Sequence, residues 1–199
     1  MATPGRDRVG DGTGLKVYGE GEWKVRNHGA GKQRTWMKLH IARDSESQQI
    51  EAVTLTSNAV DDATEVASLL GQIKKKVRSF AGDGAYDKDK VRKVLSKSGI
   101  RQVIPPQHNA VSDKEQRKHR IERDQAIKTI EAIGRKEWKE QQGYHQRSKA
   151  ETVMFRYKTI IGGALAARIK EHQKTEVTIG CKILNIMMQT AKPKSIKVA

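Results

Sequence analysis

The sequence predicts an α/β fold in which a mixed β-sheet is flanked by helices. Early segments alternate apolar and polar residues as strands do, and later segments space their apolar residues as helices do. The predicted order of elements is strand, strand, strand, helix, strand, helix, strand, helix, which is typical of a sheet covered by helices. With 199 residues, the chain is long enough for one packed domain with a small insertion.

Two adjacent strands are predicted in the first third of the chain. The segment "RTWMKLHIARD", residues 34–44, places Met37, Leu39 and Ile41 on one face. The segment "QQIEAVTLTSN" is a second strand that pairs with the first through the polar turn between them. A helix is expected over residues 61–75, because this stretch begins with two aspartates and carries apolar residues at helical spacing.

The later elements are shorter and are separated by glycine and proline. In order, the patterns predict a strand in residues 75–87, a basic helix in residues 88–99 and a strand in residues 100–106. The stretch from about 112 to 140 is charged and helical with few apolar anchors, so we expect a helical insertion at about 107–142. Two helices follow, one around Glu151 and an apolar one at 177–189.

The composition is strongly basic. Lys and Arg number 39 and Asp and Glu number 23, which gives a formal net charge of +16. Such an excess favours nucleic acid as the partner, because neutralising phosphates releases counterions; a merely soluble basic surface is the alternative. No apolar run is long enough to span a bilayer, so no membrane partner is expected. The single cysteine, Cys181, excludes an intrachain disulfide and fits a reducing cytoplasm.

Three acidic residues are candidate metal ligands by their context. Asp11 lies beside a turn in "DGTGLKVYG", Asp83 follows a short apolar strand, and Glu151 lies on a late helix. Strand ends at the edge of a sheet are where α/β folds build their sites. Converging carboxylates suit Mg²⁺, and two such ions about 4 Å apart can activate an attacking oxygen and stabilise the leaving oxygen of a phosphodiester. Taken singly, each acid is better explained as a turn former or a solvated residue.

The segment "GYHQRSKAETVMFRYK", residues 143–158, gives Glu151 a distinctive setting. At about 100° per residue, Tyr144, Arg147, Glu151 and Lys158 fall within an arc of roughly 60° and form a polar stripe roughly 20 Å long. The opposite face should meet the core and carries Val153, Tyr157, Ile160, Ile161 and Ala164. The stripe fits a metal-binding carboxylate flanked by phosphate-binding cations, but it equally fits a solvated face with an Arg147–Glu151 pair. Helical periodicity leaves both interpretations open.

The stripe resembles the Y-x2-R-x3-E-x6-K signature of bacterial insertion-sequence transposases with a DDE catalytic triad. Other segments agree with that family in the expected order: "GTGLKVYGEGEWKVRNHG", "RTWMKLHIA", "GDGAYD", "IPPQHNA", "WKEQQGYHQRSKAET" and "MFRYK". The resemblance covers roughly residues 9–195. It implies an RNase H-like fold, with residues 11–199 as the catalytic domain.

The resemblance also implies an activity and roles for individual residues. Asp11, Asp83 and Glu151 match the triad and would bind Mg²⁺ or Mn²⁺, as two ions. Tyr144, Arg147 and Lys158 match residues that contact DNA near the scissile phosphate. The implied activity is metal-dependent cleavage of double-stranded DNA at transposon ends, followed by strand transfer into target DNA. A homodimer and a bacterial cytoplasmic, nucleoid-associated location rest on the resemblance alone.

The beginning of the sequence departs from the family pattern. Family members reach the first aspartate along an apolar strand that ends "DSTG", after an N-terminal DNA-binding region; here "RDR" replaces apolar residues and Gly12 replaces the serine. We therefore expect a poorly ordered leader over residues 1–10, a shortened central strand and a truncated transposase of impaired activity. The alternative is an inactive remnant that only binds DNA. A different RNase H-like nuclease is a third hypothesis, which the ordered blocks disfavour.

Overall fold

The computed structural model describes residues 5–17 and 36–190. The start of the predicted leader, most of the block that follows Asp11 and the basic C-terminal tail lie outside these ranges. The described chain forms one six-stranded mixed sheet with the order β3-β2-β1-β4-β5, in which β6 also pairs with β1. The strands are β1 (Arg6–Val17), β2 (Trp36–Asp44), β3 (Ile50–Ser57), β4 (Val77–Ala81), β5 (Arg101–Val103) and β6 (Ala164–Leu165). The predicted α/β class with a mixed sheet is confirmed.

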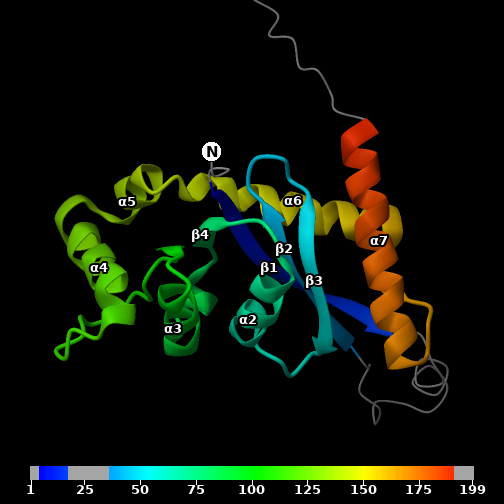
Figure 1. Ribbon diagram of the computed structural model, residues 1–199, viewed down its shortest axis with the longest axis horizontal. Coiled ribbons are helices and arrows are strands. Elements are labelled where there is room, and N and C mark those ends of the chain that lie inside the picture. The colour runs from blue at the N-terminus through cyan, green and yellow to red at the C-terminus, as the bar shows by residue number, and fades with distance from the viewer. Residues whose placement is uncertain (1–4, 18–35, 191–199) are drawn as a thin grey trace, which may run out of the picture.

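Helices cover both faces of this sheet (Figure 1). They are α2 (Asp62–Gln72), α3 (Asp89–Lys97), α4 (Ile121–Ile133), α5 (Arg135–Gln141), α6 (Ser148–Arg156) and α7 (Lys170–Thr190). Residues of α6 and α7 share a buried cluster with β1, β2 and β3, whereas α2 and α3 bury their apolar residues against the other face. None of the helices in residues 5–17 and 36–190 combines the length and the apolarity needed to cross a membrane.

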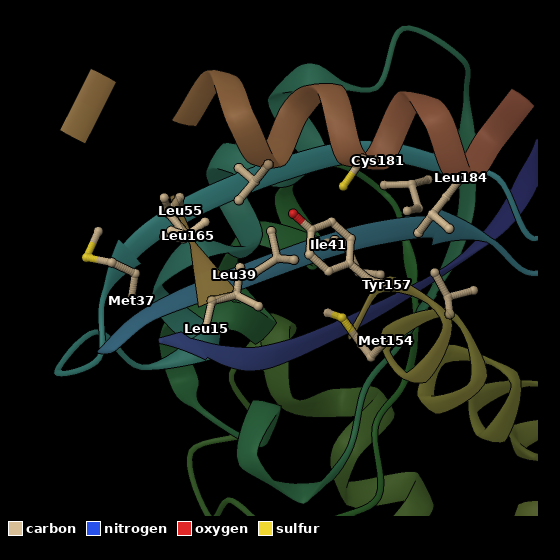
Figure 2. Close-up of a cluster of buried hydrophobic side chains, with 13 residues drawn as sticks. Leu15, Met37, Leu39, Ile41, Leu55, Met154, Tyr157, Leu165, Cys181 and Leu184 are labelled. Carbon is tan, nitrogen blue, oxygen red and sulfur yellow. The ribbon is translucent and has the colours of Figure 1, made fainter. Parts of the chain in front are cut away.

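The larger core lies between the sheet and the α6–α7 layer. Figure 2 shows Leu39 and Ile41 of β2 beneath α7, with the Tyr157 ring beside them and Cys181 and Leu184 above. Leu39 and Ile41 are on the strand face that alternation predicts, because successive strand residues point to opposite sides. The pattern of β2 thus determines which face receives the C-terminal helices.

The middle of the opposite face of β1 carries glycines, because other groups approach the strand closely there. A Cβ at Gly10 would lie 2.5 Å from the Phe80 ring, and one at Gly12 would lie 2.0 Å from Asp62 Oδ1. Asp62 is held there by a hydrogen bond of 2.8 Å to the fully buried His40. Gly12 therefore stands where the family resemblance expects serine because the Asp62 carboxylate occupies the space of that side chain.

Charge pairs hold the first half of β1. This corrects, for residues 6–10, the expectation of a poorly ordered leader, and it corrects the expectation of a shortened central strand. Strand β1 begins at Arg6 and pairs with β2 in unbroken register from Arg8 to Lys16. Arg8 is fully buried, and its guanidinium contacts Asp44 Oδ2 at 2.8 Å and Glu51 Oε2 at 2.6 Å. Carboxylates of β2 and β3 thus compensate a cation where an apolar residue was expected.

The charged segment after β5 forms α4 and α5, which lie beyond α3 in Figure 1. The buried carboxylate of Asp87 holds α4 in place: its Oδ1 accepts hydrogen bonds from Arg92 at 2.8 Å and from Arg123 of α4 at 3.1 Å. Its Oδ2 accepts the Gln107 amide at 3.0 Å. Asp87 therefore joins α3 and α4 to the turn that follows β4. That α4 and α5 form an insertion relative to other members of the fold stays a prediction.

The segment around Glu151 is not one uniform helix, so part of the predicted core face is wrong. A 3₁₀ turn (Tyr144–Arg147) precedes α6, and a π-helical turn (Tyr157–Ile161) follows it before Gly162 ends the helix with a φ of 133°. A π turn contains more residues than an α turn and shifts the helical phase. Val153 and Tyr157 are buried as expected, but Ile160 is 48% exposed and Ala164 lies in β6.

The two aspartates of "GDGAYD" should differ in their effect on stability. We expect Asp87→Asn to lower the free energy of unfolding by about 3 kcal/mol, because it leaves the buried Arg92 guanidinium without its counter-charge. Asp83→Asn should cost at most about 1 kcal/mol, since the Asp83 side chain is 41% exposed and asparagine also caps helical turns. Urea unfolding of both variants measures the difference. A larger loss for Asp83→Asn would contradict the assignment of Asp87 as the structural residue.

Candidate functional site

Asp11 and Asp83 lie where β1 and β4 separate. The last residue pair between these parallel strands joins Val9 to Ala81, and each aspartate follows two positions later. Asp11 is still within β1, paired across to Ile41 of β2, and its Oδ1 accepts a hydrogen bond of 2.9 Å from the Gly12 amide. By alternation it shares a face with Val9, which is the face covered by α6. The sheet thus presents Asp11 towards the helix that carries Glu151.

Asp83 caps the 3₁₀ turn (Gly84–Tyr86) that follows β4. Its Oδ1 accepts the Ala85 amide at 2.9 Å, which fixes the carboxylate at the strand end and leaves Oδ2 directed elsewhere. That second oxygen accepts a hydrogen bond of 3.2 Å from Arg147 Nη2. Asp83 therefore joins the end of β4 to the segment that leads into α6. Asp87 cannot take this role, because it is buried and both of its carboxylate oxygens already accept hydrogen bonds.

Arg147 connects two of the three predicted acids. Its Nη1 donates to Glu151 Oε1 at 2.8 Å, one helical turn further along, while its Nη2 donates to Asp83. The guanidinium thus lies between carboxylates that are 68 positions apart in the chain (151 − 83). The Arg147–Glu151 pair that helical spacing predicted is present. Because Arg147 also contacts Asp83, this pair faces the end of strand β4 and not only solvent.

Asp11 belongs to the same electrostatic site. Burial raises the pKa of Asp11 above its usual value, and repulsion from Asp83 and Glu151 raises it further. The Gly12 amide and the Arg147 guanidinium oppose this rise. The charges of three acids and one arginine therefore act on one another, although hydrogen bonds join only Asp83, Glu151 and Arg147 directly.

Tyr144 and Lys158, the other two residues of the predicted stripe, have different surroundings. Tyr144 is half-buried against Val9 and Val103, its ring lies 6.4 Å from the Trp138 ring, and burial raises the pKa of its hydroxyl. It therefore packs α5 against the sheet beside the acids. Lys158 lies in the π-helical turn and is exposed. The stripe is thus divided into a half-buried tyrosine, an arginine that binds two of the acids and a solvated lysine.

Arg43 is a residue near the acids that we did not single out from the sequence. It is fully buried at the end of β2; burial lowers its pKa to about 10, and attraction to Asp11 opposes that lowering. Its Nη1 donates to Gln48 Oε1 at 2.7 Å. The alternation that places Leu39 and Ile41 on the face covered by α6 and α7 continues to Arg43. The strand pattern therefore already indicated that Arg43 points to the same face as these buried residues.

Tyr86 was also missed. Its side chain is buried on the opposite face of the sheet, and the hydroxyl has no hydrogen-bond partner among the residues that the structure describes. Burial raises the pKa of this hydroxyl, and the nearby charges of Asp62 and Asp11 raise it further. The sequence offered no signal for this position, because an aromatic residue after a strand is ordinarily a packing residue.

The donor set fits a hard divalent cation by its chemistry, since Asp11, Asp83 and Glu151 all offer carboxylate oxygens. Within the described ranges, however, no three acidic, histidine or cysteine side chains lie in an arrangement that could hold a metal ion. The Arg147 guanidinium is bonded to two of the three carboxylates. The carboxylates of these acids therefore suit such an ion chemically, but in this arrangement, with Arg147 between two of them, they do not form a site for it.

A family model described as "Transposase DDE domain" matches residues 3–188, which is most of the chain. The matched region contains the strand that bears Asp11, the turn capped by Asp83 and the helix that bears Glu151. The chain therefore belongs to the transposase DDE domain family.

Proposed function

We propose that this chain cleaves DNA at the ends of an insertion sequence and transfers the cleaved strand to target DNA. The observation that carries the proposal is the Arg147-centred site, which joins the end of β4 to α6 beside Asp11 of β1. Membership of the DDE family supports transposition as the process. Ordering of β1 from Arg6 supports a usable Asp11.

Asp11, Asp83 and Glu151 are the residues that we assign to metal binding. Domains of this family generally use divalent metal ions, and these carboxylates are hard donors of the kind that Mg²⁺ and Mn²⁺ prefer. A bound ion would supply Lewis-acid stabilisation of the phosphodiester and of the attacking oxygen. The protein contributes position: Asp83 is fixed by the Ala85 amide and Asp11 by its strand.

DNA is the proposed substrate, and the cations near the acids would orient it. The net charge of +16 favours a polyanion, and Lys158 is exposed on the segment that follows α6. Tyr144, which packs α5 against the sheet, would place the adjoining Arg147 near a phosphate. A homodimer and a bacterial cytoplasmic location remain proposals that rest on the family.

Two alternatives make different predictions for the same assay. A chain that only binds DNA would bind duplexes without cutting them, and a nuclease without strand transfer would cut but never join. The anchoring of β1 favours the catalytic proposal over the first alternative, because the buried contacts of Arg8 support the strand that carries Asp11.

Metal-dependent cleavage should depend on Glu151. With Mn²⁺ and a plasmid that carries the DNA flanking the coding sequence on both sides, we expect nicked, linear and joined products. Glu151→Gln keeps the size of the side chain but removes its charge, so the cleavage rate should fall at least about 100-fold. Gel analysis of the products against time measures both cleavage and joining.

The matched control for this assay is Glu171→Gln, which removes an exposed carboxylate from α7 and should leave the rate unchanged. Absence of Mn²⁺-dependent products from the unmodified chain, with duplex binding intact, would leave DNA binding as the remaining function. Equal rates for the unmodified chain and Glu151→Gln would show that the cleavage arises elsewhere.

Lys158 should contribute a phosphate contact. We expect Lys158→Ala to weaken duplex binding and to reduce the slope of log K against log salt concentration by about one unit, because one fewer phosphate is neutralised. Lys97→Ala, an exposed lysine on the opposite helix layer, is the control and should keep the slope. Fluorescence anisotropy over a range of salt concentrations measures both. An unchanged slope for Lys158→Ala argues against a phosphate contact there.

A further inference from the structure

Arg147 has one guanidinium and two competing sets of partners. In the structure it is bonded to Asp83 and Glu151, with N–O distances of 3.2 and 2.8 Å. Only 19% of its side chain is exposed, and its Nε is buried without a partner among the described residues. The side chain is therefore folded back onto the acids and does not extend towards solvent, where a phosphate would meet it.

The position of this guanidinium conflicts with both roles of the proposed site. A divalent cation needs the oxygens of Asp83 and Glu151, and it cannot share them closely with a second cation. A DNA phosphate, in turn, presents two oxygens that the planar guanidinium of an arginine can bind through two parallel N–H groups. While Nη1 and Nη2 hold the acids, the guanidinium stays between two carboxylates, whose negative charges repel a phosphate.

The contacts of Arg147 with the acids are of a kind that can be exchanged. The side chains of its two partners are 41% exposed at Asp83 and 64% exposed at Glu151. Ion pairs with such exposure contribute little net stability, because water already solvates the separated charges. The buried pair between Arg8 and Asp44 shows the opposite case, in which both side chains are almost fully removed from solvent. Breaking these two ion pairs should therefore cost the fold little stability.

We propose that Arg147 is an internal counter-ion that occupies the acidic site in the free protein and leaves it when a DNA phosphate binds. Departure of the guanidinium frees Asp83 and Glu151, so divalent metal binds after DNA, or together with it. The proposal rests on the function proposed above and adds an order of assembly to it. One consequence is that the free protein keeps its acids neutralised and does not bind the metal tightly until a substrate is present.

Linkage makes the coupling measurable from either side. If DNA raises the affinity for the metal by some factor, the metal raises the affinity for DNA by the same factor. Couplings between two binding sites typically change an affinity 5–150-fold. Because Arg147 and the metal compete for the same two carboxylates, we expect the change in metal affinity to be at least about tenfold. If the Arg147 ion pairs were purely structural, substitution of Arg147 would leave the coupling between DNA affinity and metal affinity unchanged.

The test is a Mn²⁺ titration of the full chain, followed by the electron paramagnetic resonance signal of free Mn²⁺, with and without a blunt DNA duplex. Without DNA, Arg147→Gln should bind Mn²⁺ about tenfold more tightly than the unmodified chain. Duplex should tighten Mn²⁺ binding to the unmodified chain by a similar factor, and to Arg147→Gln by less than about twofold. Arg156→Gln is the matched control, because it removes an exposed guanidinium from α6, the helix that directly follows Arg147.

A second variant protects the test against misfolding, which circular dichroism melting curves detect. Arg147→Lys keeps the charge but replaces the guanidinium, which has two terminal nitrogens, by a single ammonium. Its Mn²⁺ affinity should therefore lie between that of the unmodified chain and that of Arg147→Gln. The proposal is overturned if neither Arg147 variant binds Mn²⁺ more tightly than Arg156→Gln. It is also overturned if duplex tightens Mn²⁺ binding equally in the unmodified chain and in Arg147→Gln.

Failure of this proposal can be told apart from failure of the proposed function. Asp83→Asn and Glu151→Gln are titrated in the same way. If both bind Mn²⁺ as the unmodified chain does, the acids are not the metal site and the function itself is wrong. If both lose Mn²⁺ while Arg147→Gln behaves like the unmodified chain, the metal site stands and only the role of Arg147 falls.

Discussion

The ion pairs that Arg8 makes inside the sheet hold the first half of β1, and the position of Asp11 depends on that strand. A buried guanidinium needs compensation by opposite charge and hydrogen bonds. Here Asp44 of the adjacent strand β2 and Glu51 of β3, one strand further away, supply it at 2.8 and 2.6 Å. Next to it, Asp7 accepts hydrogen bonds from Arg78 and from Ser79 of β4. Charge pairs thus attach β1 to strands on both sides in place of an apolar stripe.

Once β1 is fixed, the sheet determines where a site can form. Strand β4 accompanies β1 only as far as Val9, and β6 pairs with β1 from Lys16 onward. Between these two pairings this edge of β1 has no strand partner among the described residues, and α6 packs on the face of β1 that bears Asp11. Asp83 at the end of β4 and Glu151 on α6 meet there through Arg147. The three acids are therefore gathered by strand divergence and by one helix that crosses the opening.

Much of this architecture could be predicted from local pattern, and the rest depends on contacts between distant segments. Alternation in β2 placed Leu39 and Ile41 correctly, because strand period and burial are local properties. The polar start of β1 misled us, since the carboxylates that compensate Arg8 are supplied from β2 and β3, about 36 and 43 residues away in sequence. Ile160 was placed on the wrong face for a similar reason. The π-helical turn after α6 rotates the residues that follow it, and such a turn depends on packing between distant segments rather than on local helix propensity.

The central claim, that Asp11, Asp83 and Glu151 form one metal site which Arg147 vacates for DNA, is tested most directly by crystallography with Mn²⁺ and a DNA duplex. Data collected near the manganese absorption edge locate the ion independently of the refined coordinates. We predict an anomalous peak bound by these carboxylates, with the Arg147 guanidinium turned to a phosphate. A peak bound elsewhere, or Arg147 still bridging Asp83 and Glu151 in the DNA complex, would contradict the claim.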